Sequence, residues 1–120
     1  MNKLTVTSWA LQGLAAVAFL AAGGAKLAGV PMMVATFDAI GVGQWFRIVT
    51  GLVEVAGAIA LLVPAVAAFG GAVLAITMVC ATLTHLLLIG GSPVPAIVLL
   101  AVTATVAWLR RASLMALLPR

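Results

Sequence analysis

The chain has 120 residues, of which 66% are hydrophobic and only 7% are charged, and its formal net charge is +4. A soluble globular domain is about half apolar and a quarter charged, so this composition excludes a water-soluble fold and requires lipid around much of the surface. The six basic residues form no stripe with aromatic neighbours, which excludes a nucleic-acid-binding surface. Their positions are typical of membrane topology signals.

Cysteine and histidine usage excludes two kinds of redox centre. Cys80 is the single cysteine, so no dithiol cycle can run within one chain. His85 is the single histidine, which excludes a haem held by two histidines. We therefore expect no catalytic residues, no metal site and no resident cofactor. These absences favour a protein that is not an enzyme.

The first predicted membrane span covers residues 6–26, and Gln12 is its one strongly polar residue. Lys3 precedes this apolar stretch and small residues follow it, so a signal peptide is the alternative. We favour a span because no soluble domain follows that such a signal would export.

Residues 28–44 are less uniformly apolar and predict a short helix between the first two spans. Pro31 suits its first turn and Gly41 suits its C-terminal cap. Met33, Phe37 and Ile40 share one face. This helix is expected to lie in the membrane interface or to dip into the bundle, with Asp38 near its wet side.

Three further spans are predicted at 45–63, 66–89 and 94–110, separated by turns around Pro64 and around Gly-Gly-Ser-Pro at 90–93. Each is near the length of about 17 to 20 residues that a span requires. Abundant Gly and Ala allow close approach of membrane helices. The expected fold is therefore all-α, an integral membrane four-helix bundle forming a single domain over residues 1–120.

Basic residues predict the orientation of this bundle. Lys3 precedes the first span, and Arg110, Arg111 and Arg120 follow the fourth. An even number of spans places both termini on one side, and the positive-inside tendency makes that side cytoplasmic. The predicted location is the inner, cytoplasmic membrane of the cell.

Four polar residues are expected in the outer half of the bundle: Lys26, Arg47, Glu54 and His85. Lys26 ends the first span, Arg47 begins the second, and His85 lies late in the third. Glu54 lies seven residues after Arg47, about 10 Å deeper. A carboxylate in hydrocarbon requires a partner, so Glu54 is expected to bond Lys26, Arg47 or His85.

Each of these residues also has a structural interpretation that stays open. Lys26 and Arg47 would simply extend towards the headgroups, and His85 would bond a backbone carbonyl. Glu54 is too deep for that, which makes it the strongest candidate for a specific paired role, whether structural or ligand-binding. Cys80 and the methionines Met32, Met33 and Met78 are interpreted as packing residues.

At these same positions the chain resembles the DoxX-like family of small bacterial membrane proteins. The matching stretches occur in order along nearly the whole chain: AGGAKLAG around Lys26, FDAIGVGQWFR at 37–47, GLVEVAGAIALLVP at 51–64 and MVCATLTH at 78–85. The resemblance implies a four-helix membrane bundle with Lys26, Arg47, Glu54 and His85 as its polar residues. Some relatives are subunits of thiosulfate:quinone oxidoreductase systems, others associate with secreted redox enzymes, and a distant animal branch acts as a receptor-assembly chaperone.

Three functions are compatible with these residues. The first is an accessory or assembly protein, a partner subunit of a membrane redox system. The second is a subunit that binds quinone or another apolar small molecule, with Glu54, His85 and Arg47 lining the pocket. The third is a proton-coupled exporter that uses the membrane glutamate. The expected partners are the lipid bilayer, a redox-enzyme subunit or a second copy of the chain, and no nucleic acid.

Overall fold

The computed structural model describes residues 2–115, and these residues confirm the all-α fold. The elements are α1 Lys3–Ala28, α2 Pro31–Ile40, α3 Gln44–Leu61, α4 Ala67–Thr84, the π-helix η1 His85–Ile89, α5 Val94–Leu109 and α6 Arg111–Met115. Arg120, one of the predicted topology residues, lies outside the described residues.

Local sequence signals explain where α1 and α2 begin and end. The Asn2 side chain accepts a hydrogen bond from the Thr5 amide at 2.8 Å and so caps the first turn of α1. Gly29 ends α1 in the left-handed conformation, with φ of 71°. Pro31 opens α2 and Gly41 closes it with φ of 84°, as predicted from the two residue types.

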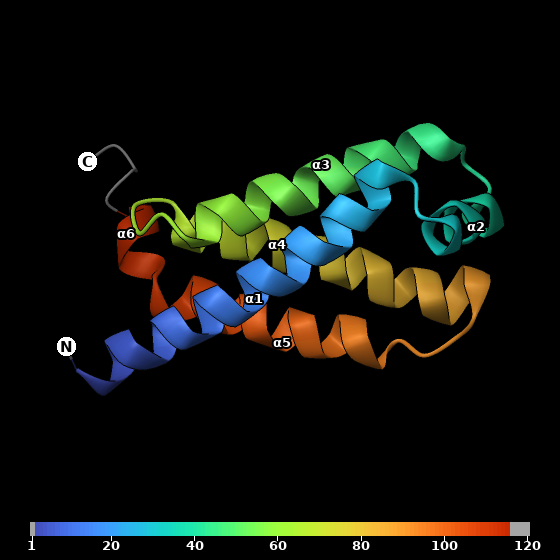
Figure 1. The fold of residues 1–120 in the computed structure, drawn as a ribbon. Coiled ribbons are helices and arrows are strands. Elements are labelled where there is room, and N and C mark those ends of the chain that lie inside the picture. Colours follow the sequence, from blue (N-terminus) through green and yellow to red (C-terminus); the bar gives the residue numbers. More distant parts are fainter. Residues whose placement is uncertain (1, 116–120) are drawn as a thin grey trace.

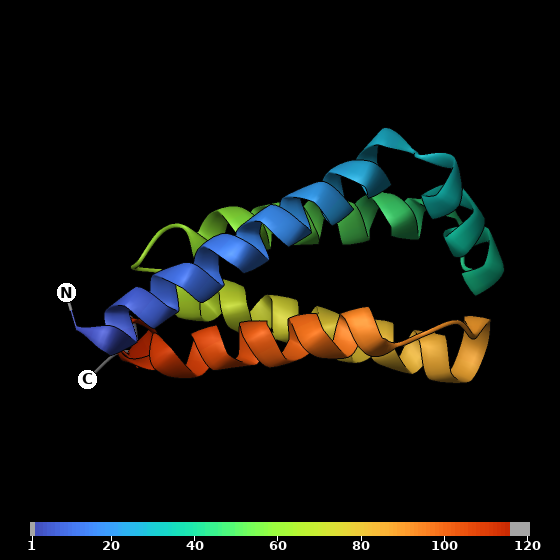
Figure 2. The same ribbon diagram turned by 60° about the horizontal axis from the view of Figure 1, so that its bottom comes forward.

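The long helices form two layers, in which α1 packs mainly against α3 and α4 packs mainly against α5 (Figure 1). Figure 2 shows that the layers lie close together at the end that holds α6 and the start of α1, and diverge towards the end that holds α2. We call these the α6 end and the α2 end. The bundle is therefore wedge-shaped.

Small residues explain the close contact between the layers away from α2. Gly70 of α4 lies so near α3 that an added Cβ atom would stand 2.8 Å from the Cβ of Ala60 and 3.1 Å from the carbonyl oxygen of Gly57. Close approach of this kind buries a core of mostly aliphatic side chains. That core includes Phe19, Leu61, Leu74 and Val106, all fully buried.

A polar network ties three helices together at the α6 end. The Gln12 side chain, which is fully buried, donates to the backbone oxygen of Leu61 at 2.6 Å. Its own amide oxygen accepts from Arg110 Nε at 2.9 Å, and the Arg110 guanidinium lies 5.3 Å from the Trp9 ring centroid. Gln12 therefore joins α1 to the C-terminal ends of α3 and α5.

Three helical segments among the described residues have the length and hydropathy to cross a bilayer: Lys3–Ala28, Gln44–Leu61 and Ala67–Ile89. Helix α5 is equally apolar but has only 16 residues. The helices therefore fit a membrane bundle, but the predicted count of four spans is not matched, because among the described residues three helical segments and not four have the length of a span. The predicted third span also differs from expectation in one detail, because its last five residues form a π-helix.

Candidate functional site

A cavity of about 620 Å³ lies at the α2 end, between α2, α3 and α4. We call it the α2-end cavity. Most of its lining is apolar and comes from residues such as Met32, Met33, Phe37, Ile40, Phe46, Val49, Val53, Ile76 and Met78. The predicted apolar face of α2, with Met33, Phe37 and Ile40, is turned towards this cavity.

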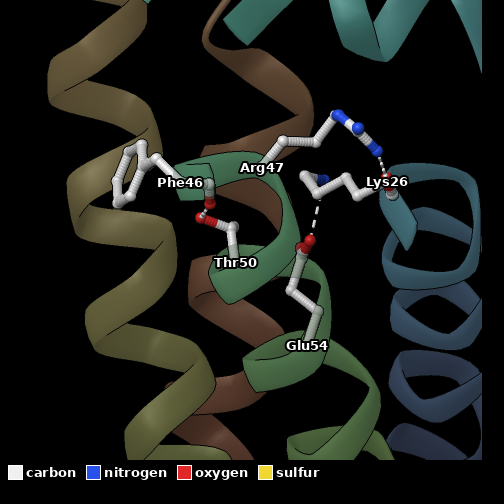
Figure 3. Close-up of polar contacts among 5 residues, drawn as sticks. All are labelled: Lys26, Phe46, Arg47, Thr50 and Glu54. Atoms are coloured by element: carbon white, nitrogen blue, oxygen red, sulfur yellow. Dashed lines mark hydrogen bonds and ion pairs between the residues drawn. The ribbon is translucent and has the colours of Figure 1, made fainter. Parts of the chain in front are cut away.

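An ion pair between α1 and α3 forms the charged part of the cavity lining. Lys26 Nζ lies 2.7 Å from Glu54 Oε1, as Figure 3 shows. The side chains are only 14% and 2% exposed. The contact is an ion pair, and among the described residues Oε1 accepts no hydrogen bond of normal geometry. Glu54 therefore has the basic partner that the cost of a carboxylate in hydrocarbon requires.

Two glycines explain why these charges meet. A Cβ atom on Gly23 would stand 2.9 Å from the carbonyl oxygen of Gly51, and one on Gly51 would stand 3.0 Å from that of Gly23. Helices α1 and α3 therefore cross with their backbones in contact. Lys26 and Glu54 each follow one of these glycines by three residues, on the same side of the helix, so the crossing brings them together.

Arg47 does not reach Glu54. Its Nη1 donates to the backbone oxygen of Lys26, and its Nε donates to Gln44 Oε1 at 2.7 Å. A guanidinium at the C-terminus of α1 gives a second donor to a carbonyl of the last turn, which also accepts from the Gly29 amide, and complements the negative end of the helix dipole. The Gln44 amide in turn donates to Asp38 Oδ1 at 2.8 Å, so Arg47 and Gln44 attach α2 to the start of α3.

His85 lies at the same end of the bundle but makes no hydrogen bond or ion pair with Lys26, Arg47 or Glu54. Its Nδ1 lies 2.8 Å from the backbone oxygen of Gly90. Because a carbonyl only accepts, Nδ1 carries a proton, and in the neutral tautomer with that proton Nε2 has a lone pair. His85 is half-buried, lines the α2-end cavity and begins the π-helix, an element that often occurs at functional sites.

The structure thus places three of the four predicted residues in the cavity lining and the fourth outside it. Lys26, Glu54 and His85 line one cavity, and Lys26 and Glu54 are in contact. Arg47 is not part of the cavity lining, and its guanidinium donates to the backbone oxygen of Lys26 at the end of α1 (Figure 3).

Sequence reasoning missed a set of hydroxyl-bearing residues in the cavity lining: Thr36, Thr50, Thr77 and Thr84. A signal for two of them was present, because Thr77, Cys80 and Thr84 recur at helical spacing on one face of an otherwise apolar span. Thr50 likewise precedes Glu54 by one turn. These residues were overlooked because isolated threonines in a membrane helix usually bond their own backbone.

The fold and the cavity together define a small helical membrane protein with a largely apolar pocket, open to one side, and a buried ion pair. The profile of the DoxX-like family matches residues 10–112. The chain belongs to this family, which confirms the resemblance found in its sequence. Searches of curated proteins and of solved structures gave no match.

Proposed function

We propose that this protein is an accessory subunit of a membrane redox system and that it binds a neutral apolar molecule of the quinone class in the α2-end cavity. The observation that carries the proposal is the composition of that cavity. Sites for small molecules are typically about 300 to 1,000 Å³, mostly apolar, with a few convergent polar groups. A volume of about 620 Å³ lined by apolar side chains together with Lys26, Glu54 and His85 fits this description.

The ion pair also bears on the choice between functions. In a proton-coupled exporter the membrane carboxylate must alternate between proton and substrate. Here Lys26 stands 2.7 Å from Glu54, so the carboxylate already has a cation as partner. This arrangement favours a binding subunit over an exporter. Electrons for any quinone chemistry would come from a partner protein.

A cavity-filling substitution tests the proposal. Thr77→Phe places an aromatic ring in the cavity, and Thr105→Phe is its matched control, because Thr105 is exposed on α5 and also bonds its own helix backbone. We expect Thr77→Phe to weaken the binding of a short-chain quinone roughly 10-fold or more, the scale of a steric or overpacking cost. The control variant should bind like the parent. Binding is measured by calorimetry on the full chain in detergent.

Equal affinity in the two variants would place any quinone binding outside the cavity. Absence of binding in the parent protein, with quinones of several tail lengths, would refute the proposed function itself.

We further propose that the protein lies in the cytoplasmic membrane with both termini in the cytoplasm. Lys3 begins α1, and Arg110 and Arg111 follow α5 at the same end of the bundle (Figure 1). A basic cluster of this kind favours the cytoplasmic side. The α2-end cavity then faces the outer leaflet.

Reporter fusions test this orientation. A periplasmic phosphatase fused after Arg120 should be inactive, whereas the same enzyme inserted in the loop between α2 and α3, at Val42, should be active. The reverse pattern would mean an inverted molecule, and activity at both sites would mean that the two ends of the bundle lie on one side of the membrane.

A further inference from the structure

We propose that the α2-end cavity prefers a ligand with hydroxyl groups, such as a phenol or a hydroquinone, over the corresponding carbonyl or ether compound. This inference rests on the proposed function and adds the hydrogen-bonding character of the ligand. Its basis is an inventory of the donors and acceptors that line the cavity.

The four threonines contribute acceptors only. Each hydroxyl is half-buried and donates its single proton to the backbone oxygen four residues earlier in its own helix. The donor–acceptor distances are 2.7 to 2.9 Å for Thr36, Thr50, Thr77 and Thr84. What remains for a ligand at each of these positions is an oxygen lone pair.

The two strongest polar groups add further acceptors. His85 uses its Nδ1 proton on Gly90, which leaves the lone pair of Nε2. Glu54 is a carboxylate with several lone pairs, and among the described residues Lys26 is its only charged partner within 4 Å. Strong donors are fewer, namely the remaining protons of the Lys26 ammonium and the Ser92 hydroxyl.

The Lys26–Glu54 pair is complementary to a hydroxyl group. An ammonium and a carboxylate side by side offer one donor and one acceptor at the same place, and a hydroxyl can accept from the first while donating to the second. A ketone or an ether accepts only, so it leaves the carboxylate without a new partner. The two opposite charges also cancel, which favours a neutral ligand.

The test compares a 4-alkylphenol with its methyl ether, two probes of nearly equal size and tail. Dissociation constants are measured on the full chain in detergent, and the Thr77→Phe variant gives the background from partition into micelles. We expect the phenol to bind at least 10-fold tighter than the ether above this background, the scale of one charge-assisted hydrogen bond. A quinol should likewise bind tighter than the quinone with the same tail.

The double variant Lys26→Met/Glu54→Leu assigns the preference to the ion pair. It keeps the volume of the site, so the ether should still bind while the phenol advantage falls to about 3-fold or less. If this variant does not fold, the comparison of the two probes on the parent protein decides alone. Equal binding of phenol and ether by the parent would overturn the inference and leave the proposed function standing, whereas no binding of either probe or of any quinone would refute both.

Discussion

The Glu54→Ala variant is expected to lose about 3 to 5 kcal/mol of stability, the usual cost of breaking a buried ion pair by removing one partner. The Lys26 side chain is only 14% exposed and that of Glu54 only 2%. In the variant, Lys26 therefore keeps its charge in a buried place after the carboxylate beside it has been removed. The measurement is the unfolding free energy or thermal midpoint in detergent. Asp38→Ala is the matched control, because it removes the other acidic residue from an exposed position and loses only the exposed hydrogen bond from Gln44.

Asp38→Ala should change stability by less than about 1 kcal/mol, as for exposed charged groups. An equal loss in both variants would mean that total charge, and not the buried pair, sets the stability. Removing both partners, as Lys26→Met/Glu54→Leu, should recover much of the loss, since apolar replacement of a buried pair is often neutral.

The same double variant separates a structural role from a binding role. If the pair only supports the bundle, the variant should be stable and should complement a deletion strain. If the pair forms part of a binding site, the variant should be stable and fail to complement. Arg47→Met combined with Glu54→Ala should not restore stability, because Arg47 bonds the end of α1 and not Glu54.

The Gln12→Leu variant should be the second most damaging substitution. It removes the donor to the Leu61 carbonyl and the acceptor for Arg110 Nε at a fully buried position. A buried carbonyl such as that of Leu61, left without its side-chain donor, costs about 1 to 3 kcal/mol. We expect a lower thermal midpoint together with faster proteolysis of the turn between α3 and α4, since Leu61 ends α3.

Thr105→Leu serves as the control for this prediction. It also replaces a polar side chain in a membrane helix by leucine, but the Thr105 hydroxyl bonds only its own helix, at the Ala101 oxygen. Its midpoint should stay close to that of the parent. A Gln12→Leu variant as stable as this control would show that the network at the α6 end contributes little.

Much of the fold could be predicted from sequence because its signals are local. Hydropathy marked the helices, and Pro31 and Gly41 marked the ends of α2. The π-helix at His85–Ile89 was missed, since no local pattern distinguishes it from the end of an α-helix. The predicted count of four spans was not exact, because α5 has only 16 residues and three other helical segments have the length of a span.

The partner of Glu54 could not be chosen from sequence. Lys26, Arg47 and His85 were all at suitable depth, and depth follows from counting residues. Which of them faces Glu54 depends on how α1 and α3 are rotated, and that rotation depends on the contact between Gly23 and Gly51. The role of these residues in ligand binding stays a prediction.

The short helix α5 has a consequence for the surrounding lipid. At 1.5 Å per residue its 16 residues extend about 24 Å, whereas the hydrocarbon core of a bilayer is about 30 Å thick. If α5 crosses the bilayer, we expect the membrane to be thinner beside it, because lipid cannot satisfy the backbone amides of the turn at 90–93. Hydrophobic mismatch would then be confined to the flank formed by α5, while the flank formed by α1, with 26 residues, fits a bilayer of ordinary thickness.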